Sequence, residues 1–142
     1  KRFLHSGEAA FATAGSVNAK CFDLNGDRIS IAICADTVSP DHPRWAAEAG
    51  ATVYAAGVLW SHAGYDADAA QIKAHCIQHG FAALVANHAA PTGGYVAAGK
   101  SAFWAPGGQL LCTAPQEAPA LLLAQRSGNV WTSRSTPVNP GP

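Results

Sequence analysis

Methionine is absent from the 142-residue sequence, and charged residues are scarce. Nine acidic and nine basic residues give a formal net charge of zero, and charged residues make up 13% of the chain. The basic residues form no run, which argues against a nucleic-acid partner or an anionic membrane. No apolar run approaches the length that spans a bilayer. We therefore expect no nucleic acid and no membrane among its partners.

The missing methionine also bears on the start of the chain. Ordinary removal of an initiator methionine is not expected to expose a side chain as long as that of Lys1. We therefore expect the chain to be a fragment, a processed subunit or the ordered part of something longer. Its apolar content of 49% and its length suit one compact domain.

No CxxC pair is present either. Cys21, Cys34, Cys76 and Cys112 are widely spaced, which favours reduced thiols in a cytoplasmic protein over a disulfide framework, although composition leaves a disulfide open. His75 and His79 lie four residues apart on a predicted helix and could share a metal. Two ligands do not make a zinc site, so packing or interface roles are the favoured interpretation.

The hydrophobic pattern predicts an α/β fold. Alternating strands and helices after a hairpin signal at residues 25–27 imply parallel strands with right-handed crossovers. From Ala89 onward the pattern changes to turns and short strands. Residues 127–142, rich in Ser, Pro and Asn, are interpreted as a tail or interaction arm that follows a domain of residues 1–126. The predicted strands are 18–24, 29–33, 51–59, 81–87, 100–105, 109–113 and 120–125, and the predicted helices are 43–50 and about 66–78.

A cysteine at the end of a buried strand is the first candidate for chemistry. Ile29, Ile31 and Ile33 alternate with small residues, and Cys34 follows directly. On a strand-to-helix turn, a thiolate can be stabilised by a helix N-terminus and can reach a carbonyl or nitrile carbon. A plain buried thiol is an equally good interpretation of this stretch alone.

Two further candidates end parallel strands of the same predicted sheet. Trp60 closes the strand over residues 51–59, and Asn87 closes the next one. Ligands of parallel sheets gather at the carboxyl edge, so both are candidate substrate-binding residues near Cys34. For Trp60, an aromatic plug in the core is about as good an interpretation.

The segment Gly94–Ser101 matches the phosphate-binding pattern G-x-x-x-x-G-K-[ST]. That motif needs a helix starting at the Lys-Ser pair, whereas a short strand and a turn are predicted here. No aspartate follows Ser101, so a downstream magnesium-binding acid is missing. Nucleotide binding is therefore the least favoured hypothesis.

Several motifs in order resemble the C-terminal half of the carbon–nitrogen hydrolase, or nitrilase, superfamily. Residues 1–8 resemble its lysine motif followed by Gly-Glu, and residues 33–36 with the later Pro40 resemble its nucleophile motif. Gly50 and the run to Trp60 are similar to its G-A-D strand and tryptophan. Asn87 is similar to its strand-ending asparagine, and residues 99–108 match its G-x-S-x-x-x-x-P-x-G, which also accounts for the Lys-Ser pair.

The resemblance implies half of an α-β-β-α sandwich, a mixed sheet with two main helices on one face. It implies hydrolysis of a non-peptide C–N bond through a thioester on Cys34, with no metal or organic cofactor. Lys1 and the backbone N–H of Ala35 would bind the oxyanion, and Glu8 would position the substrate or Lys1. Cys-Ala-Asp is closer to the amidase pattern than to Cys-Trp-Glu, which favours a small-molecule amide, carbamoyl or ureido substrate.

One catalytic group of the family has no counterpart in the sequence. The general-base glutamate belongs to the half that precedes Lys1, and none of Glu8, Glu48 and Glu117 stands in its place. We therefore expect the missing N-terminal half or a second polypeptide as a partner, and a homo-oligomer. The alternative is a non-catalytic nitrilase-like interaction subunit or an inactive fragment.

Overall fold

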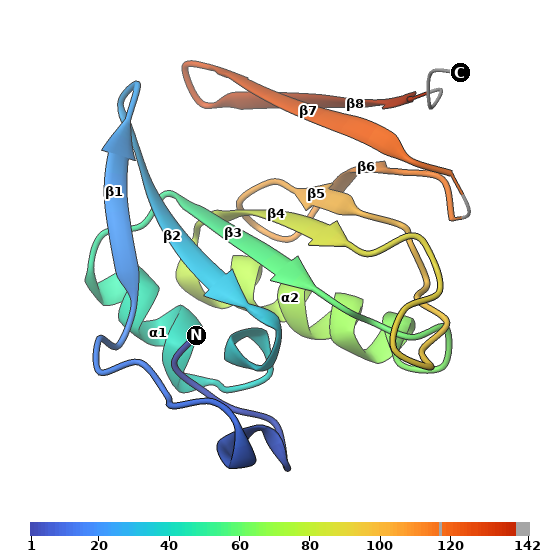
Figure 1. Cartoon of the computed structure of the whole chain (residues 1–142). Coiled ribbons are helices and arrows are strands. Elements are labelled where there is room, and N and C mark those ends of the chain that lie inside the picture. The colour runs from blue at the N-terminus through green and yellow to red at the C-terminus, as the bar shows by residue number, and fades with distance from the viewer. Residues whose placement is uncertain (117, 139–142) are drawn as a thin grey trace.

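The computed structural model describes residues 1–116 and 118–138, and six of its strands form one mixed sheet in the order β1-β2-β3-β4-β5-β6 (Figure 1). Strands β2, β3 and β4 are parallel, and the outer pairs are antiparallel. This arrangement confirms the predicted α/β class and the crossover connections. The strands are β1 (Lys20–Leu24), β2 (Asp27–Ile33), β3 (Val53–Val58), β4 (Ala82–Asn87), β5 (Ala102–Trp104) and β6 (Leu110–Thr113).

The hairpin between β1 and β2 turns at the predicted residues. Asn25 and Gly26 both have positive φ, 50° and 84°. A two-residue turn with both central residues in the left-handed region matches the twist of the flanking strands, and asparagine and glycine tolerate it best. The turn therefore fixes the register of the edge strand β1 against β2.

Two helices cover one face of the sheet (Figure 1). Helix α1 (Asp41–Glu48) begins after Pro40, and α2 (Tyr65–His79) ends at Gly80, whose φ of 74° suits a glycine C-cap. The core between them and the sheet includes Tyr54, which is stacked on Phe81 at 5.1 Å between ring centroids. No helix in the described part of the chain has the length and hydropathy to span a bilayer.

A second hairpin, β7 (Ala120–Ser127) with β8 (Val130–Pro137), lies against the other face near β5 and β6 (Figure 1). Trp131 packs on Phe103 at 5.1 Å between ring centroids, and Arg126 pairs with Asp27 at 2.9 Å. Strand β8 falls within residues 127–142, the predicted tail or interaction arm, so most of that segment has regular structure. Residues 139–142 of that prediction lie outside the described residues.

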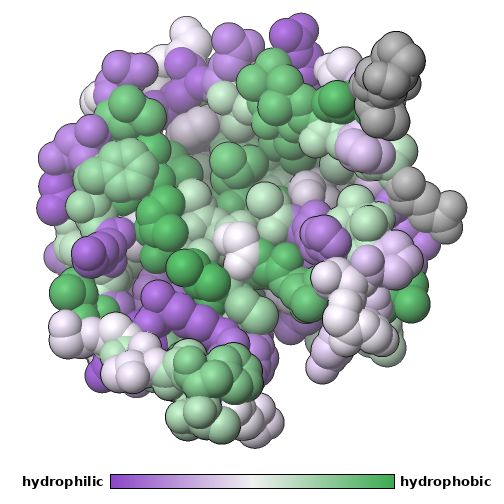
Figure 2. All heavy atoms as spheres, viewed as in Figure 1, coloured by the Kyte–Doolittle hydropathy of each residue, from purple (hydrophilic) through white to green (hydrophobic). Residues whose placement is uncertain are grey.

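The rest of this second face is open. Four large apolar side chains of β1 and β2 are between 41% and 52% exposed: Phe22, Leu24, Ile31 and Ile33. Figure 2 shows apolar side chains gathered on this part of the surface. The β1–β2 end of the sheet thus lacks the cover that the helices give the opposite face.

Candidate active site

Cys34 occupies the turn where β2 passes into the short 3₁₀ helix η2 (Cys34–Thr37). Its φ of 49° lies in the left-handed region. That conformation is unfavourable by about 1 kcal/mol or more for residues that have a Cβ atom. The Thr37 hydroxyl donates a hydrogen bond to the carbonyl of Cys34 at 2.8 Å and closes the turn. The thiol is partly exposed, so the structure places Cys34 on a strand-to-helix turn as predicted, without burying it in the core.

The carboxylate of Asp36 ties this turn to the N-terminal segment. Asp36 is only 2% exposed. Its Oδ2 accepts the N–H of Ile33 at 3.0 Å, and its Oδ1 accepts the N–H groups of Arg2 and Phe3, both at 2.8 Å. One buried carboxylate therefore binds three backbone donors, two of them more than thirty residues away in sequence. From the sequence, Asp36 was noted only as part of the nucleophile-motif resemblance.

A buried histidine lies behind this carboxylate. Nε2 of His42 is 3.9 Å from Oδ2 of Asp36, and Nδ1 is 2.9 Å from the hydroxyl oxygen of Tyr54. Burial lowers the pKa of His42, and the negative charge of Asp36 opposes that shift. Burial likewise raises the pKa of Tyr54. We call Asp36, His42, Tyr54 and the three bound N–H groups the Asp36 network.

Lys1 and Glu8 form an ion pair beside the turn. Nζ of Lys1 donates to both carboxylate oxygens of Glu8, at 2.7 and 2.5 Å. Oε2 of Glu8 also accepts the backbone N–H of His5. The hydrogen bonds from Lys1, then from His5, lower the pKa of Glu8, so its carboxylate is ionised at neutral pH. The structure thus brings the predicted pair of Lys1 and Glu8 together.

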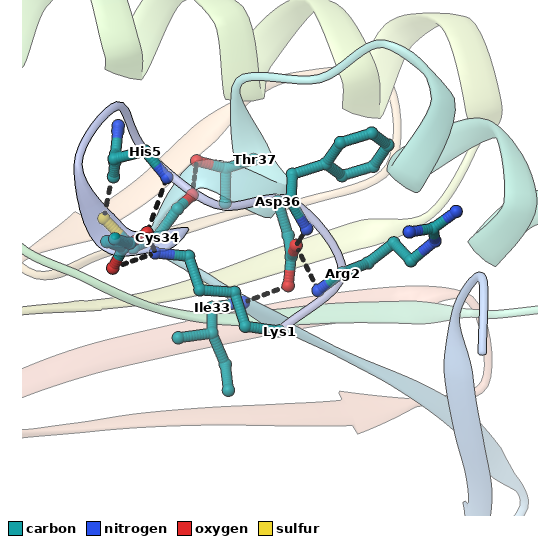
Figure 3. A network of polar contacts seen from close by, with 9 residues as sticks. Lys1, Arg2, His5, Ile33, Cys34, Asp36 and Thr37 are labelled. Carbon is teal, nitrogen blue, oxygen red and sulfur yellow. Dashed lines mark hydrogen bonds and ion pairs between the residues drawn. The ribbon is translucent and has the colours of Figure 1, made fainter. Parts of the chain in front are cut away.

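The imidazole of His5 contacts the cysteine directly. Nε2 of His5 lies 3.2 Å from Sγ of Cys34, within hydrogen-bond distance for sulfur. Figure 3 shows His5, Lys1 and Asp36 gathered around the Cys34 turn. No separate role was predicted for His5 from the sequence. The available signal was its position inside residues 1–8, which the lysine-motif resemblance already placed near Cys34.

Ala35 contributes its backbone to the same turn. Its side chain is buried, and its N–H belongs to the first turn of η2. N–H groups in the first turn of a helix have no partner within that helix and point toward its N-terminal end. Donation of this N–H to an oxygen bound next to Cys34 stays a prediction.

Trp60 and Asn87 form a separate buried cluster. Oδ1 of Asn87 accepts the N–H of Trp60 at 2.8 Å, and Nδ2 donates to the carbonyls of Gly99 and Trp60 at 2.7 and 3.3 Å. The Trp60 ring is 5% exposed and meets Tyr65 edge-on at 5.8 Å. We call this cluster the Asn87 network. Its polar side-chain atoms bind backbone groups, and the indole packs in the core.

A cavity lies next to this site. It has a volume of about 550 Å³, and its wall includes Lys1, Asp36 and the open-face residues Phe22, Ile31 and Ile33. Cys34 is not part of the wall. The cavity is therefore the hollow between the N-terminal segment and the open sheet face, and the thiol lies outside it.

The other candidate motifs have ordinary structural surroundings. Strand β5 begins directly after Ser101, as expected from the sequence, and no helix starts at the Lys-Ser pair. Nε2 of His75 is 3.3 Å from the carbonyl oxygen of Thr37, and the rings of His75 and His79 are 6.1 Å apart. Among the residues with described placement, no group of three or more potential metal ligands comes together.

Solved structures of an amidase share this fold. A variant of the amidase from Nesterenkonia sp. AN1, with the acetamide moiety of fluoroacetamide added covalently at its active-site cysteine, matches with a TM-score of 0.74 and 23% identity. The match covers 96% of this chain and 48% of the amidase chain. A cysteine-to-alanine variant of that amidase in complex with butyramide matches with a TM-score of 0.73 and 25% identity, over 82% and 45% of the two chains.

The chain therefore spans about half the length of the amidase chains that it matches, and its sheet with two helices corresponds to about half of their fold. No curated protein matches it significantly. The family model for carbon–nitrogen hydrolases matches residues 4–134, nearly the whole chain. The chain belongs to the carbon–nitrogen hydrolase family, the nitrilase superfamily.

Proposed function

We propose that this chain carries the nucleophile of a cysteine-dependent hydrolase that acts on small amide, carbamoyl or ureido compounds. The observation that supports this most is the docking of residues 1–8 onto the Cys34 turn by Asp36. It brings an ammonium, a carboxylate and an imidazole to a partly exposed thiol, and these are the groups that acyl transfer requires.

In the proposed reaction, the Cys34 thiolate attacks the carbonyl carbon and forms a C–S bond. The negative charge that develops on the carbonyl oxygen is stabilised by Lys1 and by the N–H of Ala35, and Glu8 holds Lys1 in position. The C–N bond then breaks, the amine leaves with a proton, and a thioester remains on Sγ. Water releases the acid and regenerates the thiol.

Trp60 and Asn87 enter this proposal as the residues that shape the neighbouring part of the substrate site. Asn87 fixes the backbone at Trp60 and Gly99. Since both side chains are mostly buried, we propose that substrate meets the loops they hold more than their polar atoms. No metal or organic cofactor takes part in the proposed chemistry.

We also propose that another polypeptide segment, the N-terminal half or a separate chain, completes the domain. Support comes from the coverage of about half of each matched amidase and from the open apolar face of β1 and β2. A segment packed there would cover Ile31 and Ile33 and would carry the general-base glutamate to the site. Homo-oligomerisation and a cytoplasmic location belong to the same proposal; four free thiols suit a reducing compartment.

The second candidate function is a non-catalytic interaction subunit that keeps the fold as a binding platform. The same open face supports it, since exposed apolar surface marks interaction sites. Thiol reactivity separates the two functions. If Cys34 is an activated nucleophile, it is alkylated at neutral pH faster than Cys21, Cys76 and Cys112. If it has no catalytic role, it is not.

The decisive experiment is amide hydrolysis by the whole protein and by its Cys34→Ala variant. Butyramide is a suitable first substrate because a similar solved amidase binds it. We expect turnover by the parent protein, no turnover by the variant and the same circular dichroism spectrum for both. Turnover that survives in the variant would rule out Cys34 as the nucleophile.

A further inference from the structure

Two side chains of α2 hold the backbone of the turn that carries Cys34. Nε2 of His75 is 3.3 Å from the carbonyl oxygen of Thr37, and Nε2 of Gln71 donates to the carbonyl of Val38 at 2.9 Å. Residues four apart lie on one face of a helix, so both side chains reach the end of η2 from the same face of α2. We propose that His75 is a positioning residue for the Cys34 turn, an inference that rests on the proposed function for its catalytic meaning.

A continuous path of hydrogen bonds leads from His75 to the backbone of Cys34. The imidazole donates to the carbonyl of Thr37, and the hydroxyl of the same Thr37 donates to the carbonyl of Cys34 at 2.8 Å. The N–H of Val38 donates to the carbonyl of Ala35 at 3.2 Å and closes η2. His75 therefore fixes the residue whose side chain ties the end of η2 back to its start.

The Cys34 turn depends on such contacts because its backbone is strained. The φ of Cys34 is 49°, and a residue stays in a conformation of this kind only where the surrounding structure holds it there. The carboxylate of Asp36 fixes the strand side of the turn, and Thr37 with His75 fixes the helix side. Release of the helix side would let φ of Cys34 relax, which would move Sγ and reorient the N–H of Ala35.

The acceptor determines the tautomer of His75. A carbonyl oxygen only accepts hydrogen bonds, so Nε2 of the imidazole carries the proton. The side chain is 6% exposed, and burial lowers its pKa, although the hydrogen bond to Thr37 opposes that shift. The imidazole is therefore neutral at neutral pH. It holds the turn without placing a charge behind it.

The test compares variants of the whole protein. His75→Phe keeps a planar ring but loses the donor, and His75→Gln keeps an N–H donor at about the distance of Nε2 from the backbone. Thr37→Val removes the hydroxyl with little change of shape, so it interrupts the same path even if His75→Phe does not fold. His79→Phe is the matched control, since His79 lies one turn further along α2 and stacks on Phe81, as a phenyl ring can also do.

Hydrogen exchange of the Val38 amide, followed by NMR, reports the closure of η2. We expect exchange to be about tenfold faster in His75→Phe and in Thr37→Val, because each loses one hydrogen bond of the path. Since both changes interrupt one path, the double variant should exchange no faster than either single variant. His75→Gln should restore most of the protection, and His79→Phe should leave it at the parent level.

Amide hydrolysis reports the chemistry. We expect His75→Phe to lower kcat about tenfold or more and to leave KM nearly unchanged, because a displaced thiol and N–H of Ala35 lose contacts that matter in the transition state. His75→Gln should recover most of kcat. A loss of stability alone would not divide the effect between kcat and KM in this way.

These readouts separate the inference from the proposed function. Val38 exchange at the parent rate in His75→Phe or in Thr37→Val would overturn the positioning role, and so would a kcat that falls as far in His75→Gln as in His75→Phe. Faster Val38 exchange in His75→Phe, in a protein that hydrolyses no amide, would support the hold of His75 on the turn and contradict the hydrolase proposal. Full turnover and unchanged exchange in His75→Phe would contradict the inference alone.

Discussion

The Asp36 network and the Asn87 network lie at the carboxyl ends of neighbouring parallel strands, yet they are built differently. Asn87 uses both ends of its amide on backbone groups of Trp60 and Gly99, and all three are loop or strand-end positions. Asp36 also binds backbone groups, but what it fixes is a segment with a lysine, a histidine and a glutamate next to a thiol.

The comparison shows that position at the sheet edge is not enough to identify a reactive group. In the Asn87 network, every polar side-chain contact of Asn87 is a backbone contact, so nothing is left for a ligand. Around Cys34, side chains contact side chains and stay partly exposed, which leaves them available for chemistry. One network holds backbone segments together, and the other positions the side chains that we propose to be reactive.

Asn87→Asp should have the largest effect on stability. The change is isosteric, but it turns a donor that faces two carbonyl oxygens into a buried, unpaired negative charge. We expect the free energy of unfolding to fall by about 3–5 kcal/mol, measured by urea denaturation. Asn129→Asp in the exposed β7–β8 turn is the control. If Cys34 alkylation also changed in the folded variant, the two networks would not be separate.

Lys1→Met should lower turnover and should change the stability of the fold little. It removes the cation that we propose to bind the oxyanion and keeps a long apolar stem. Loss of one such donor lowers kcat by about 100–1,000-fold, or about 2.7–4 kcal/mol in the transition state. Lys73→Met on the exposed side of α2 is the control for a lost lysine charge. An unchanged kcat would remove Lys1 from the proposed mechanism.

Asp36→Asn is the reciprocal isosteric change. The amide keeps one acceptor oxygen, and its NH₂ group faces a backbone N–H that loses its partner. We expect the free energy of unfolding to fall by about 2 kcal/mol, because hydrogen bonds to a charged carboxylate are lost or weakened. Loosening of Arg2 and Phe3 should also slow Cys34 alkylation, which Asn87→Asp should not. Asp66→Asn, at an exposed position of α2, controls for the lost charge.

The smallest expected effect concerns pH, and it involves His42 of the Asp36 network. Burial holds the pKa of His42 below its ordinary value of 6.5 in the folded chain. As the pH falls through 6.5, the unfolded chain binds the proton first, so the free energy of unfolding decreases. One histidine contributes at most about 1.4 kcal/mol per pH unit.

Urea denaturation at pH 5.5 and 7.5 measures this slope. His75 lies close to the same turn, and burial lowers its pKa too, so it adds to the slope in the same direction. His42→Gln should flatten the dependence, whereas His88→Gln, which changes an exposed residue, should not. A slope as steep in His42→Gln as in the parent would show that His42 is protonated in the folded chain or that other groups dominate.

Most of the fold could be predicted from sequence because it depends on local patterns. Alternating isoleucines, the Asn-Gly turn and Gly80 each act within a few residues, and they gave the strands, the hairpin and the end of α2 close to their observed positions. Strand β8 was missed because its polar, serine-rich sequence lacks the apolar alternation of a half-buried strand; it is stabilised by pairing with β7 and by the packing of Trp131 on Phe103.

The candidate site was predictable only in part. The motif resemblance named Lys1, Glu8 and Cys34, and the structure brings the first two together beside the third. The contacts of Asp36 with Arg2 and Phe3, and of His5 with Cys34, join residues about thirty positions apart. Such contacts depend on how the N-terminal segment folds back, and no spacing rule in the sequence encodes that path.

The backbone of Cys34 carries a consequence for how this domain can change. A residue with φ of 49° is strained by about 1–2 kcal/mol unless it is glycine, and glycine costs about 0.4–1 kcal/mol through its greater freedom in the unfolded chain, so Cys34→Gly should make the fold slightly more stable while removing the thiol. Stability therefore favours glycine at this position, whereas reactivity requires cysteine. A lineage that no longer needs the nucleophile would gain stability by replacing this cysteine with glycine. A change in a single codon would be enough.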